Sequence, residues 1–473
     1  MDPFYSYQQT RRNHWQNVAR KMTHWSGWGG PYRNRLNQVV KSLAVPGLQV
    51  LELGCGRGDL LASLNPSFGV GVDFSTGMVR LARQAHPNMH FVAADVQQLP
   101  VQGKFDVIIL SDLVNDLWDV QAVFHQMLAL CKPTTRIVLN TYSRVWQLPL
   151  WLAEKLSLAK PNLEQNWFTV PDLKNLLSLT GYESLRSWME VLFPFQVPLL
   201  SPFFNKVLVR FWPFSQLAVT NFVLAHPSPH ETQLPFHVSV VVPARNEEGN
   251  IASIVERIPD MGAGTEIIFV EGHSTDQTYA RILEVAAAHP ERKISVLQQT
   301  GIGKGDAVRA GFAKASGEIL MILDADLTVS PEDLPRFYEA LASGKGDFIN
   351  GVRLVYPMQE NAMRSLNFIG NKLFSVAFTW LLGQSVKDTL CGTKVLWKGG
   401  YERIAANRSY FGDFDPFGDF DLLFGAARQN MKIVDLPIRY CERTYGTTNI
   451  QRWKHGWLLV RMVFFALRRL KFI

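Results

Sequence analysis

The chain has 473 residues, of which 47% are hydrophobic and 19% charged. This composition excludes a disordered or fibrous protein, and the length predicts two domains because single cores seldom grow past ~250 residues. The formal net charge is +7, with basic residues concentrated at both ends. We expect them to meet phosphate-bearing ligands or an anionic lipid surface, or else to form a solvated face. No segment has the pattern of a nucleic-acid module, so no nucleic-acid partner is expected.

The cysteines and the apolar runs of the sequence indicate the cellular compartment in which we expect the protein. The four cysteines are scattered without a CxxC pair, which favours a reducing cytoplasm. The first residues lack the apolar run of a signal peptide, and no stretch reaches the ~18–20 apolar residues of a membrane-spanning helix. Three shorter apolar segments, 191–218, 364–383 and 456–467, are candidates for surfaces or interfaces. We expect a cytoplasmic protein that associates peripherally with the inner face of the cell membrane.

The first half of the chain alternates short apolar runs with helical patterns. Strands are predicted at 48–53, 68–74, 89–94, 105–112 and 136–142, with helices at 76–85 and 120–131. Such alternation predicts a parallel sheet covered by helices on both faces. Later runs at 183–191 and 217–225 are expected to close this sheet antiparallel. The Pro-rich, polar segment 226–236 predicts a linker, after which a second β/α series begins.

The first strand runs into a glycine-rich turn, LELGCGRG. Its glycines, which let ligand atoms approach backbone amides, are Gly54, Gly56 and Gly58. Glu52, Asp73 and Asp95 stand at the ends of three successive strands, so they are expected to point into one crevice, where a carboxylate can bind ribose hydroxyls. The alternative is that these acids only cap the helices that follow.

These motifs resemble the class I S-adenosylmethionine-dependent methyltransferases over about residues 10–225. The resemblance implies S-adenosylmethionine, rather than NAD, as the cofactor. It implies that Glu52 lies near the methionine end, that Asp73 holds the ribose and that Asp95 meets the adenine, with the three glycines forming the loop. Ser111, at the end of the fourth strand, is also expected at the cofactor.

The methyl acceptor is not predicted by any motif. Methyl transfer from a sulfonium depends mainly on positioning, with a base added when the acceptor is a hydroxyl. The residues nearest the acceptor side are Ser111, Asp112 and Asn115. Trp15, Trp25 and Trp28 in the basic N-terminal segment either form a lid or pack on the sheet.

A second motif, ILMILDAD, ends an apolar strand in Asp324 and Asp326. Paired carboxylates at the rim of a parallel strand are typical of a divalent-ion site that neutralises a diphosphate leaving group. Three segments precede this motif: SVVVPARNEEGNI, with a strand and a Pro-containing turn; EIIFVEGHSTDQT, with a strand ending in Glu271; and the positively charged loop GIGKGDAVRAGF.

Their order and spacing resemble the family 2 glycosyltransferases of the glycosyltransferase A fold, across about residues 237–450. Among these, the polyprenyl- or dolichyl-phosphate sugar synthases are most similar. The resemblance implies an inverting enzyme with a nucleotide-sugar donor and with Mg²⁺ or Mn²⁺ on Asp324 and Asp326. The implied donor-binding residues are Pro243, Ala244, Arg245, Glu247, Glu271, Lys304 and Asp324.

Two later blocks also match the family. VKDTLCGTKVL contributes Asp388, Cys391, Gly392 and Lys394, and IRYCERTYGTTN contributes Arg443 and Gly446. The resemblance places Arg353 beside the reacting phosphates. Arg443, with Arg364 as a second candidate, is expected on an acceptor phosphate because guanidinium forks suit such oxygens.

The sequence is compatible with two kinds of sugar acceptor, a phosphate or a hydroxyl group. A phosphate is already ionised, whereas a hydroxyl usually needs a carboxylate to take its proton. GDFDPFGDFDLL offers Asp413, Asp415, Asp419 and Asp421, of which Asp421 best fits a general base or, alternatively, a helix N-cap. Three residues depart from the family pattern. Gly272 concerns the identity of the nucleobase in the donor, and Thr328 and Asn449 concern the assignment of a lipid-phosphate acceptor.

In the basic tail at 451–473, Lys454, Arg461 and Arg468 recur every seven residues beside an apolar face. This pattern predicts either an interfacial helix or an amphipathic helix docked on its own domain. Taken together, we expect two doubly wound α/β domains at 1–225 and 237–450, forming a bifunctional enzyme whose sugar acceptor is a polyprenyl phosphate or another glycolipid or glycan. The alternative is a hydroxyl-acceptor glycosyltransferase whose first domain is a non-catalytic cofactor-binding or scaffold module.

Overall fold

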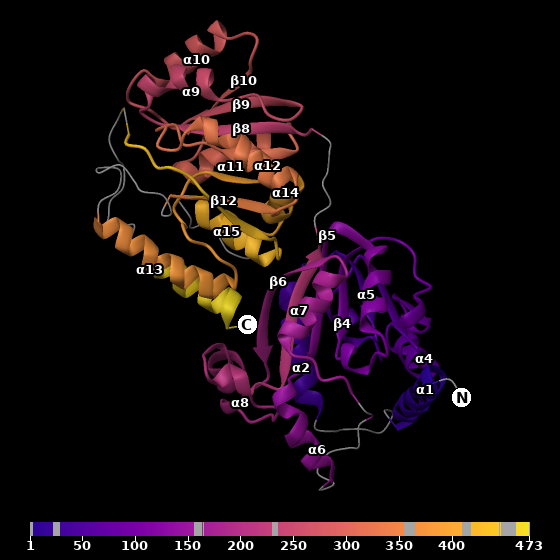
Figure 1. Cartoon of the computed structure of the whole chain (residues 1–473). Helices are drawn as coiled ribbons and strands as arrows, with labels where there is room; N and C mark the ends of the chain where they lie inside the picture. The colour runs from indigo at the N-terminus through magenta and orange to yellow at the C-terminus, as the bar shows by residue number, and fades with distance from the viewer. Residues whose placement is uncertain are drawn as a thin grey trace. The chain divides into compact units, whose positions relative to one another are not determined.

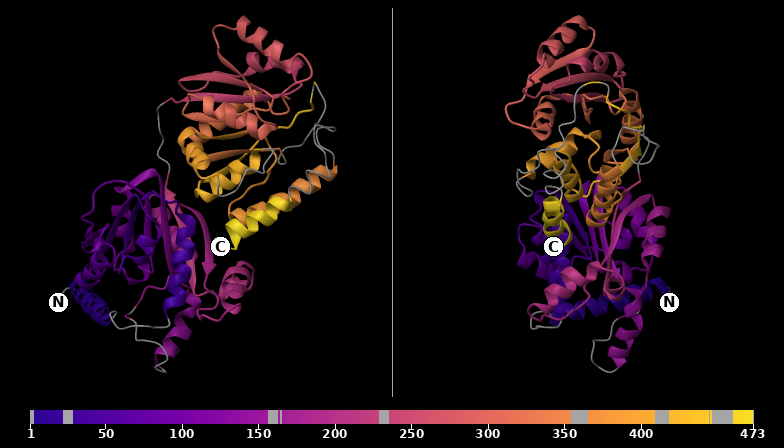
Figure 2. Two further views of the ribbon diagram at one scale, coloured as in Figure 1. Left: turned by 180° about the vertical axis from the view of Figure 1, so that it is seen from behind. Right: turned by 90° about the vertical axis from the view of Figure 1, so that its left-hand side faces the viewer.

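The computed structural model describes residues 3–21, 29–155, 163, 165–228, 235–353, 365–408, 418–443, 445 and 460–472. The chain divides into two compact units, with the boundary between Ser228 and Pro229 (Figure 1). Each unit is built on its own seven-stranded sheet. Helices cover both faces of each sheet, as Figure 2 shows.

The sheet of the first unit has the strand order β3-β2-β1-β4-β5-β7-β6. The strands are β1 (Gln49–Leu53), β2 (Phe68–Asp73), β3 (His90–Ala93), β4 (Phe105–Ser111), β5 (Cys131–Tyr142), β6 (Tyr182–Glu190) and β7 (Thr220–Pro227). The first five are parallel, and β7 is antiparallel to both β5 and β6. The predicted parallel sheet with an antiparallel closure is confirmed.

Two helical layers cover this sheet. The helices are α1 (Pro3–Lys21), α2 (Gly29–Leu43), α3 (Asp59–Ser63), α4 (Thr76–Ala85), α5 (Val120–Leu128), α6 (Gln147–Lys155), α7 (Val170–Leu179) and α8 (Leu200–Pro202). Apolar residues of α2, α3 and α4 form one core cluster with the strands, and those of α5 and α7 form another. Polar side chains fix the helix starts: Ser75 caps α4, and Thr169 and Asp172 form a capping box on α7.

The sheet of the second unit has the order β10-β9-β8-β11-β13-β12-β14. The strands are β8 (His237–Ala244), β9 (Gly264–Glu271), β10 (Lys293–Gln298), β11 (Ile319–Ile322), β12 (Phe348–Val352), β13 (Lys394–Trp397) and β14 (Ile433–Pro437). Strand β13 pairs antiparallel with β11 and β12, and the other pairs are parallel. The sheet is therefore mixed, and the ends of β8, β9 and β11 lie at one edge.

The helices of this unit are α9 (Ile251–Arg257), α10 (Thr278–Ala288), α11 (Lys304–Lys314), α12 (Leu334–Ala342), α13 (Ser365–Leu382), α14 (Lys398–Ala406) and α15 (Asp419–Arg428). The segment after residue 460 is helical and ends in η11 (Leu467–Lys471). Its Met462 and Ala466 are buried in one core cluster with α13 and α15, and Arg461 and Arg468 are exposed. The described part of the tail is thus docked on its own unit, with Arg461 and Arg468 outward. Lys454 lies outside the described residues. No helix among the described residues is long and apolar enough to cross a bilayer.

Candidate functional sites

The first candidate site is a cavity of about 640 Å³ at the carboxyl ends of β1, β2 and β4. It brings together most of the residues predicted at the cofactor: Glu52, Gly54, Gly56, Asp73, Asp95 and Ser111. Gly58 caps α3 with a positive φ of 73°, and a Cβ there would lie 2.5 Å from the Phe91 ring. Gly58 therefore allows the close packing of the turn, while the other two glycines line the cavity.

Glu52 is a buried acid at the end of β1. Its Oε2 accepts a hydrogen bond of 3.1 Å from the backbone N–H of Leu61, which fixes the start of α3 against the strand. Burial raises the pKa of Glu52 to about 8, and the Leu61 bond only partly opposes this. A cation brought into the cavity beside Glu52 would favour its ionised form.

Asp73 and Asp95 both act on the backbone around the cavity. Asp73 accepts bonds of 2.9 Å from the N–H groups of Gly56 and Ser75, so it holds the glycine turn in place. Asp95 accepts 2.9 Å from Gln97 N–H, which caps a short helical turn, and it also contacts Gln8 of α1. Asp73 and Asp95 thus accept hydrogen bonds from the backbone and also line the cavity.

The sequence did not predict two tyrosines, Tyr32 and Tyr142, that line the cavity beside Asp112. Asp112 accepts hydrogen bonds from Tyr32 Oη at 2.9 Å and from Asn140 Nδ2 at 2.6 Å. Tyr142 stacks on Tyr32 with ring centroids 5.9 Å apart. Burial raises the pKa of Asp112 to about 6, because the bonds from Tyr32 and Asn140 offset it only in part. Tyr32, Asp112 and Tyr142 all line the cavity, but Tyr32 lies on α2, far from the motifs in sequence.

Asn115, by contrast, does not line the cavity described above. Its Nδ2 donates to Asn166 O at 2.7 Å, and its Oδ1 accepts from Tyr142 N at 3.3 Å. Asn115 therefore ties the segment after β4 to the end of β5 and to the stretch before α7. Its role in the described structure is positional.

Helix α1 borders the cavity and is joined to the segment after β4 through Asp116. Trp15 Nε1 donates to Asp116 Oδ2 at 2.9 Å, and Arg11 Nε lies 3.4 Å from Asp116 Oδ1. Tyr7 and Trp15 also line the cavity. The lid predicted from the tryptophans is compatible with the position of Trp15, whereas Trp25 and Trp28 lie outside the described residues.

The second candidate site surrounds the DAD motif after β11. Asp324 Oδ1 lies 2.5 Å from Lys304 Nζ at the start of α11, and Asp326 Oδ2 lies 2.7 Å from an Arg443 nitrogen. The same guanidinium contacts Glu247 Oε1 at 3.1 Å. Burial raises the pKa of Glu247 to about 7, although Arg443 opposes this. Burial also acts on Asp324, but the Lys304 ammonium outweighs it and lowers the pKa of that carboxyl.

The predicted donor-binding residues at the ends of β8 and β9 lie side by side. Ala244 is paired with Glu271 in the parallel ladder, and Pro243 with Val270. Glu271 Oε1 accepts a bond of 2.5 Å from Ser274 N–H, which shapes the turn after β9. Arg245 is exposed just beyond β8. These positions form one edge with the DAD motif, since β8 lies between β9 and β11.

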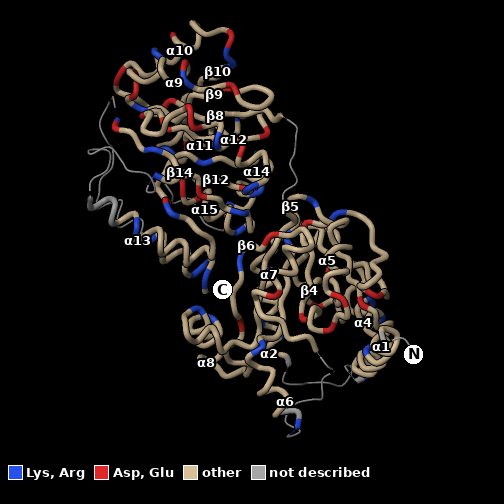
Figure 3. The backbone as a smooth tube through the Cα atoms, in the orientation of Figure 1, with Lys and Arg blue, Asp and Glu red and all other residues tan. Residues whose placement is uncertain are grey.

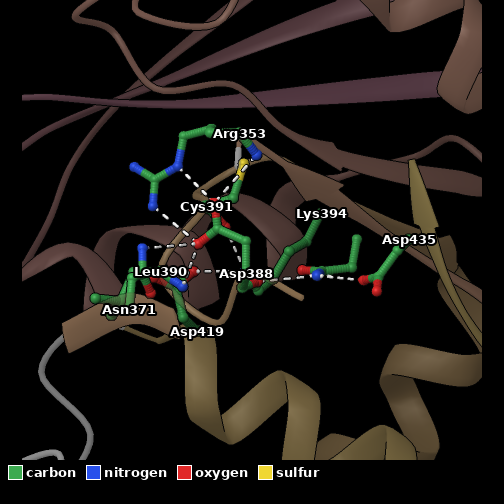
Figure 4. A network of polar contacts seen from close by, with 9 residues as sticks. Arg353, Asn371, Asp388, Leu390, Cys391, Lys394, Asp419 and Asp435 are labelled. Carbon is green, nitrogen blue, oxygen red and sulfur yellow. Dashed lines mark hydrogen bonds and ion pairs between the residues drawn. The ribbon is translucent and has the colours of Figure 1, made fainter. Parts of the chain in front are cut away.

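Figure 4 shows a network of ion pairs and hydrogen bonds around Asp388. It lies near the DAD motif, since the charges of its Arg353 and Lys394 act on Asp324. Arg353 holds Asp388 through two bonds, of 2.7 and 2.9 Å, and Asn371 donates to the same carboxylate at 3.3 Å. Burial would raise the pKa of Asp388, but the Arg353 guanidinium holds it below its ordinary value. Lys394 Nζ lies 3.2 Å from Asp419 Oδ1. Arg353 is therefore fixed by Asp388, with its orientation set before any ligand binds.

The two acids of α15 have different surroundings. Asp421, the predicted base, pairs with Arg408 at 2.9 Å. Asp419 is buried and is one of the charges that raise the pKa of Lys304, against the effect of burial. A Cβ on Gly418 would lie 2.7 Å from the Gly305 Cα, so this end of α15 packs against the GKG loop. Asp413 and Asp415, like Arg364 and Gly446, lie outside the described residues.

The acids at the DAD motif suit a hard divalent cation. Mg²⁺ is commonly bound through one or two carboxylates, with waters and substrate phosphates completing its coordination. Asp324 and Asp326 supply this minimum. Within the described ranges, no group of three or more His, Cys, Asp or Glu side chains could hold a metal. Gly392 leaves room at this point, since a Cβ there would lie 2.0 Å from Asp324 Oδ2.

Comparison with known families agrees with the division into two units. Residues 44–183 match the family model described as "Methyltransferase domain", and residues 239–404 match "Glycosyl transferase family 2". Each match lies within one unit. The two matched segments contain the glycine-rich turn and the DAD motif, respectively.

Individual relatives match one half of the chain at a time. The low-salt glycan biosynthesis hexosyltransferase Agl6 of Haloferax volcanii is 29% identical over 231 residues, covering 48% of this chain and 52% of that protein. An undecaprenyl-phosphate 4-deoxy-4-formamido-L-arabinose transferase of Edwardsiella ictaluri is 38% identical over 214 residues, covering 44% and 61%. The chain thus spans about half the length of the first relative. Among solved structures, magnesium protoporphyrin IX methyltransferase from Synechocystis with bound SAH shares 19% identity, covers 47% of this chain and all of its own, and has a TM-score of 0.34.

Proposed function

We propose that this chain, which carries a methyltransferase domain and a family 2 glycosyltransferase domain, is a bifunctional enzyme. The first unit transfers a methyl group from S-adenosylmethionine. The second transfers a sugar from a nucleotide-sugar, with inversion and with a divalent metal, to a polyprenyl phosphate or a related glycolipid at a membrane surface. The observation that carries the proposal is that each unit gathers its acids at the ligand-binding edge of its own sheet.

In the first unit, the cavity residues account for binding and positioning. S-adenosylmethionine supplies a methyl group on a positively charged sulfonium. Glu52 and Asp73 bind its polar groups, and the turn held by Asp73 presents backbone N–H groups. Helix α1 lines one side of the cavity and would exclude water from a cofactor bound there. Asp112, held by Tyr32 and Asn140, accepts the proton when the methyl acceptor is a hydroxyl.

In the second unit, catalysis depends on positive charge placed beside the phosphates of the sugar-nucleotide donor and of the acceptor. Asp324 and Asp326 would hold Mg²⁺ or Mn²⁺, and the ion would supply positive charge that neutralises the diphosphate leaving group. Lys304 and Arg353 stabilise the same oxygens, and Arg443 binds the acceptor phosphate. A direct in-line displacement at the anomeric carbon gives inversion. Retention of configuration in the product would contradict this mechanism.

The lipid-phosphate acceptor is supported by the relatives' names and by the arginines. The name of one relative specifies undecaprenyl phosphate, and Arg353 and Arg443 both lie close to acids of the second site. A phosphate acceptor needs no general base, which agrees with the pairing of Asp421 to Arg408. A hydroxyl acceptor is the second candidate, and Asp419 is then the nearer acid to the donor site.

The metal assignment is tested with Asp326→Asn. This variant keeps the oxygen that accepts from Thr328 but loses the negative charge, so Mn²⁺-stimulated turnover of the sugar nucleotide is expected to fall at least about 100-fold. Glu284→Gln, a surface change on α10, is the matched control. Unchanged Mn²⁺-stimulated turnover in Asp326→Asn would refute the assignment.

The cofactor assignment is tested with Gly56→Arg. Gly56 lines the cavity and has a positive φ of 52°, and a Cβ there meets no atom within 4 Å. The arginine is therefore expected to strain the turn and to extend into the cavity, which abolishes binding of S-adenosylmethionine in isothermal titration. Binding by the wild type without methyl release on any lipid extract would favour the non-catalytic alternative. Mass spectrometry of lipids from cells with and without the protein would identify both acceptors.

A further inference from the structure

The first unit exposes a group of large apolar side chains around the segment that joins β6 to β7. This segment runs through α8 and the turns η5 (Phe203–Val207), η6 (Leu208–Arg210) and η7 (Phe214–Leu217). Leu199 is 86% exposed and Trp212 80% exposed, and α6 adds Leu148, which is 67% exposed. We call Leu148, Trp151, Leu199, Phe203, Trp212 and Leu217 the apolar rim. An exposed patch of this kind on one unit marks an interaction surface.

The apolar rim lies at the same edge of the sheet as the cofactor cavity. Tyr142 ends β5 and lines the cavity, and it is paired with Thr220, where the rim segment enters β7. Glu190, where the segment leaves β6, is paired with the same Thr220. Trp146 Nε1, just before α6, donates to Leu217 O at 2.9 Å, which joins the two parts of the rim. The rim therefore lies beside the wall that Tyr142 and Tyr32 form.

The charged residues near the apolar rim indicate what kind of surface it binds. Residues 143–155 and 191–219 contain four basic residues, Arg144, Lys155, Lys206 and Arg210, and one acid, Glu154. Arg210 is paired with Glu190 at 2.6 Å, so the excess positive charge comes from the other basic residues. The coil that begins at α8 shows basic positions without acidic ones (Figure 3). Lys155 Nζ lies 4.1 Å from the centre of the Trp151 ring. Exposed Trp and Phe beside basic residues are typical of the boundary between headgroups and acyl chains. This charge pattern matches an anionic lipid surface.

We propose that the apolar rim docks the first unit on an anionic lipid bilayer, so that its cofactor cavity takes a methyl acceptor that resides in the membrane. The inference rests on the proposed methyl transfer and adds the class of its substrate. Trp212 and Leu199 enter the acyl boundary, while Arg144 and Lys206 lie at the phosphates. Because the rim is beside the Tyr142 wall, a lipid headgroup reaches Asp112 without leaving the bilayer.

The test is sedimentation of the full-length protein with vesicles of phosphatidylcholine mixed with phosphatidylglycerol. Replacing both Leu199 and Trp212 by Asp is expected to lower the partition coefficient at least about tenfold, because two large apolar side chains no longer enter the lipid. The matched control replaces Phe68 and Leu179, which are also exposed, by Asp. Phe68 begins β2 and Leu179 precedes β6, so both lie at the opposite edge of the sheet.

Binding of S-adenosylhomocysteine and turnover of the sugar nucleotide, both measured without lipid, report separately on the two proposed activities. Both are expected to be unchanged in the rim variant, and the neutral pair Leu199→Asn and Trp212→Gln replaces it if the Asp variant does not fold. Three results would overturn the inference: no sedimentation of the wild type, equal loss in the rim and control variants, or a rim variant that changes a dimer into a monomer while lipid binding persists. The last result would assign the rim to a second copy of the chain.

Discussion

At the scale of single residues, Gly392 allows the CGTK segment to approach the DAD motif closely. A Cβ at this position would lie 2.0 Å from Asp324 Oδ2 and 2.2 Å from Lys304 Nζ. The two side chains form a tight ion pair through Asp324 Oδ1, so neither can move without disturbing the other. The glycine is thus required by space at the proposed donor site.

Gly392→Ala is expected to reduce sugar-nucleotide turnover by at least about tenfold and to cost roughly 1–3 kcal/mol of stability, as overpacking does. The matched control is Gly399→Ala in α14, where a Cβ meets nothing within 4 Å. Turnover and thermal unfolding of both variants are the measurements. Wild-type turnover in Gly392→Ala would show that the CGTK segment does not approach Asp324 in solution.

The raised pKa of Glu52 predicts how the stability of the first unit depends on pH. Its pKa is raised to about 8 from an ordinary 4.5, so the folded state retains a proton that the unfolded chain releases above about pH 4.5. The stability of this unit is therefore expected to fall as the pH rises from about 4.5 to 8, and to level off above that.

Glu52→Gln keeps an oxygen for the Leu61 bond and carries no charge. It is expected to stabilise the first unit by roughly 2–4 kcal/mol at pH 8.5 and by little at pH 4.5. Calorimetric unfolding at the two pH values is the measurement, with the exposed Glu256→Gln as the control. Equal effects of Glu52→Gln at both pH values would mean that Glu52 is ionised in the folded cavity.

At the scale of elements, α1 is joined to the segment after β4 by two side chains that bind Asp116. Arg11 and Trp15 both bind Asp116, and bonds to a charged group contribute roughly 1.5–3 kcal/mol each. Replacing Arg11 by Ala and Trp15 by Phe is expected to weaken S-adenosylhomocysteine binding about tenfold in isothermal titration. Arg12→Ala, on the exposed side of the helix, should bind as the wild type does. Equal binding by all three proteins would show that α1 is not a lid.

Elements with a clear period were predictable, and those defined by long-range contacts were not. The runs around Val50 and Ile108 are mostly apolar, without strict alternation, because the middle of each strand is buried on both faces, and this pattern predicts a parallel sheet from sequence alone. Tyr32 and Asn140 reach Asp112 from α2 and β5, and no local pattern relates these positions. The interpretation of α15 shows the same limit, because Asp419 and Asp421 are distinguished by their ion pairs with Lys394 and Arg408, which no local pattern predicts.

At the scale of the whole molecule, each unit has its own cores and its own ligand edge. Among the described residues, the buried core clusters of the first unit end at Ala225 and those of the second begin at Val238. Units with separate cores unfold as separate cooperative transitions. We therefore expect the two proposed activities to be separable by mutation within the intact chain.

Calorimetry of the full-length protein tests this independence. A ligand stabilises the unit that binds it by about 2.7 kcal/mol at a concentration 100 times its Kd. S-adenosylhomocysteine is therefore expected to raise one transition, and a nucleoside diphosphate with Mn²⁺ the other. Gly56→Arg should remove the first shift alone and Asp326→Asn the second alone. If one ligand raised both transitions, or if either variant removed both shifts, the two sites would be coupled, because only a ligand that distinguishes two states of the other unit can change its stability.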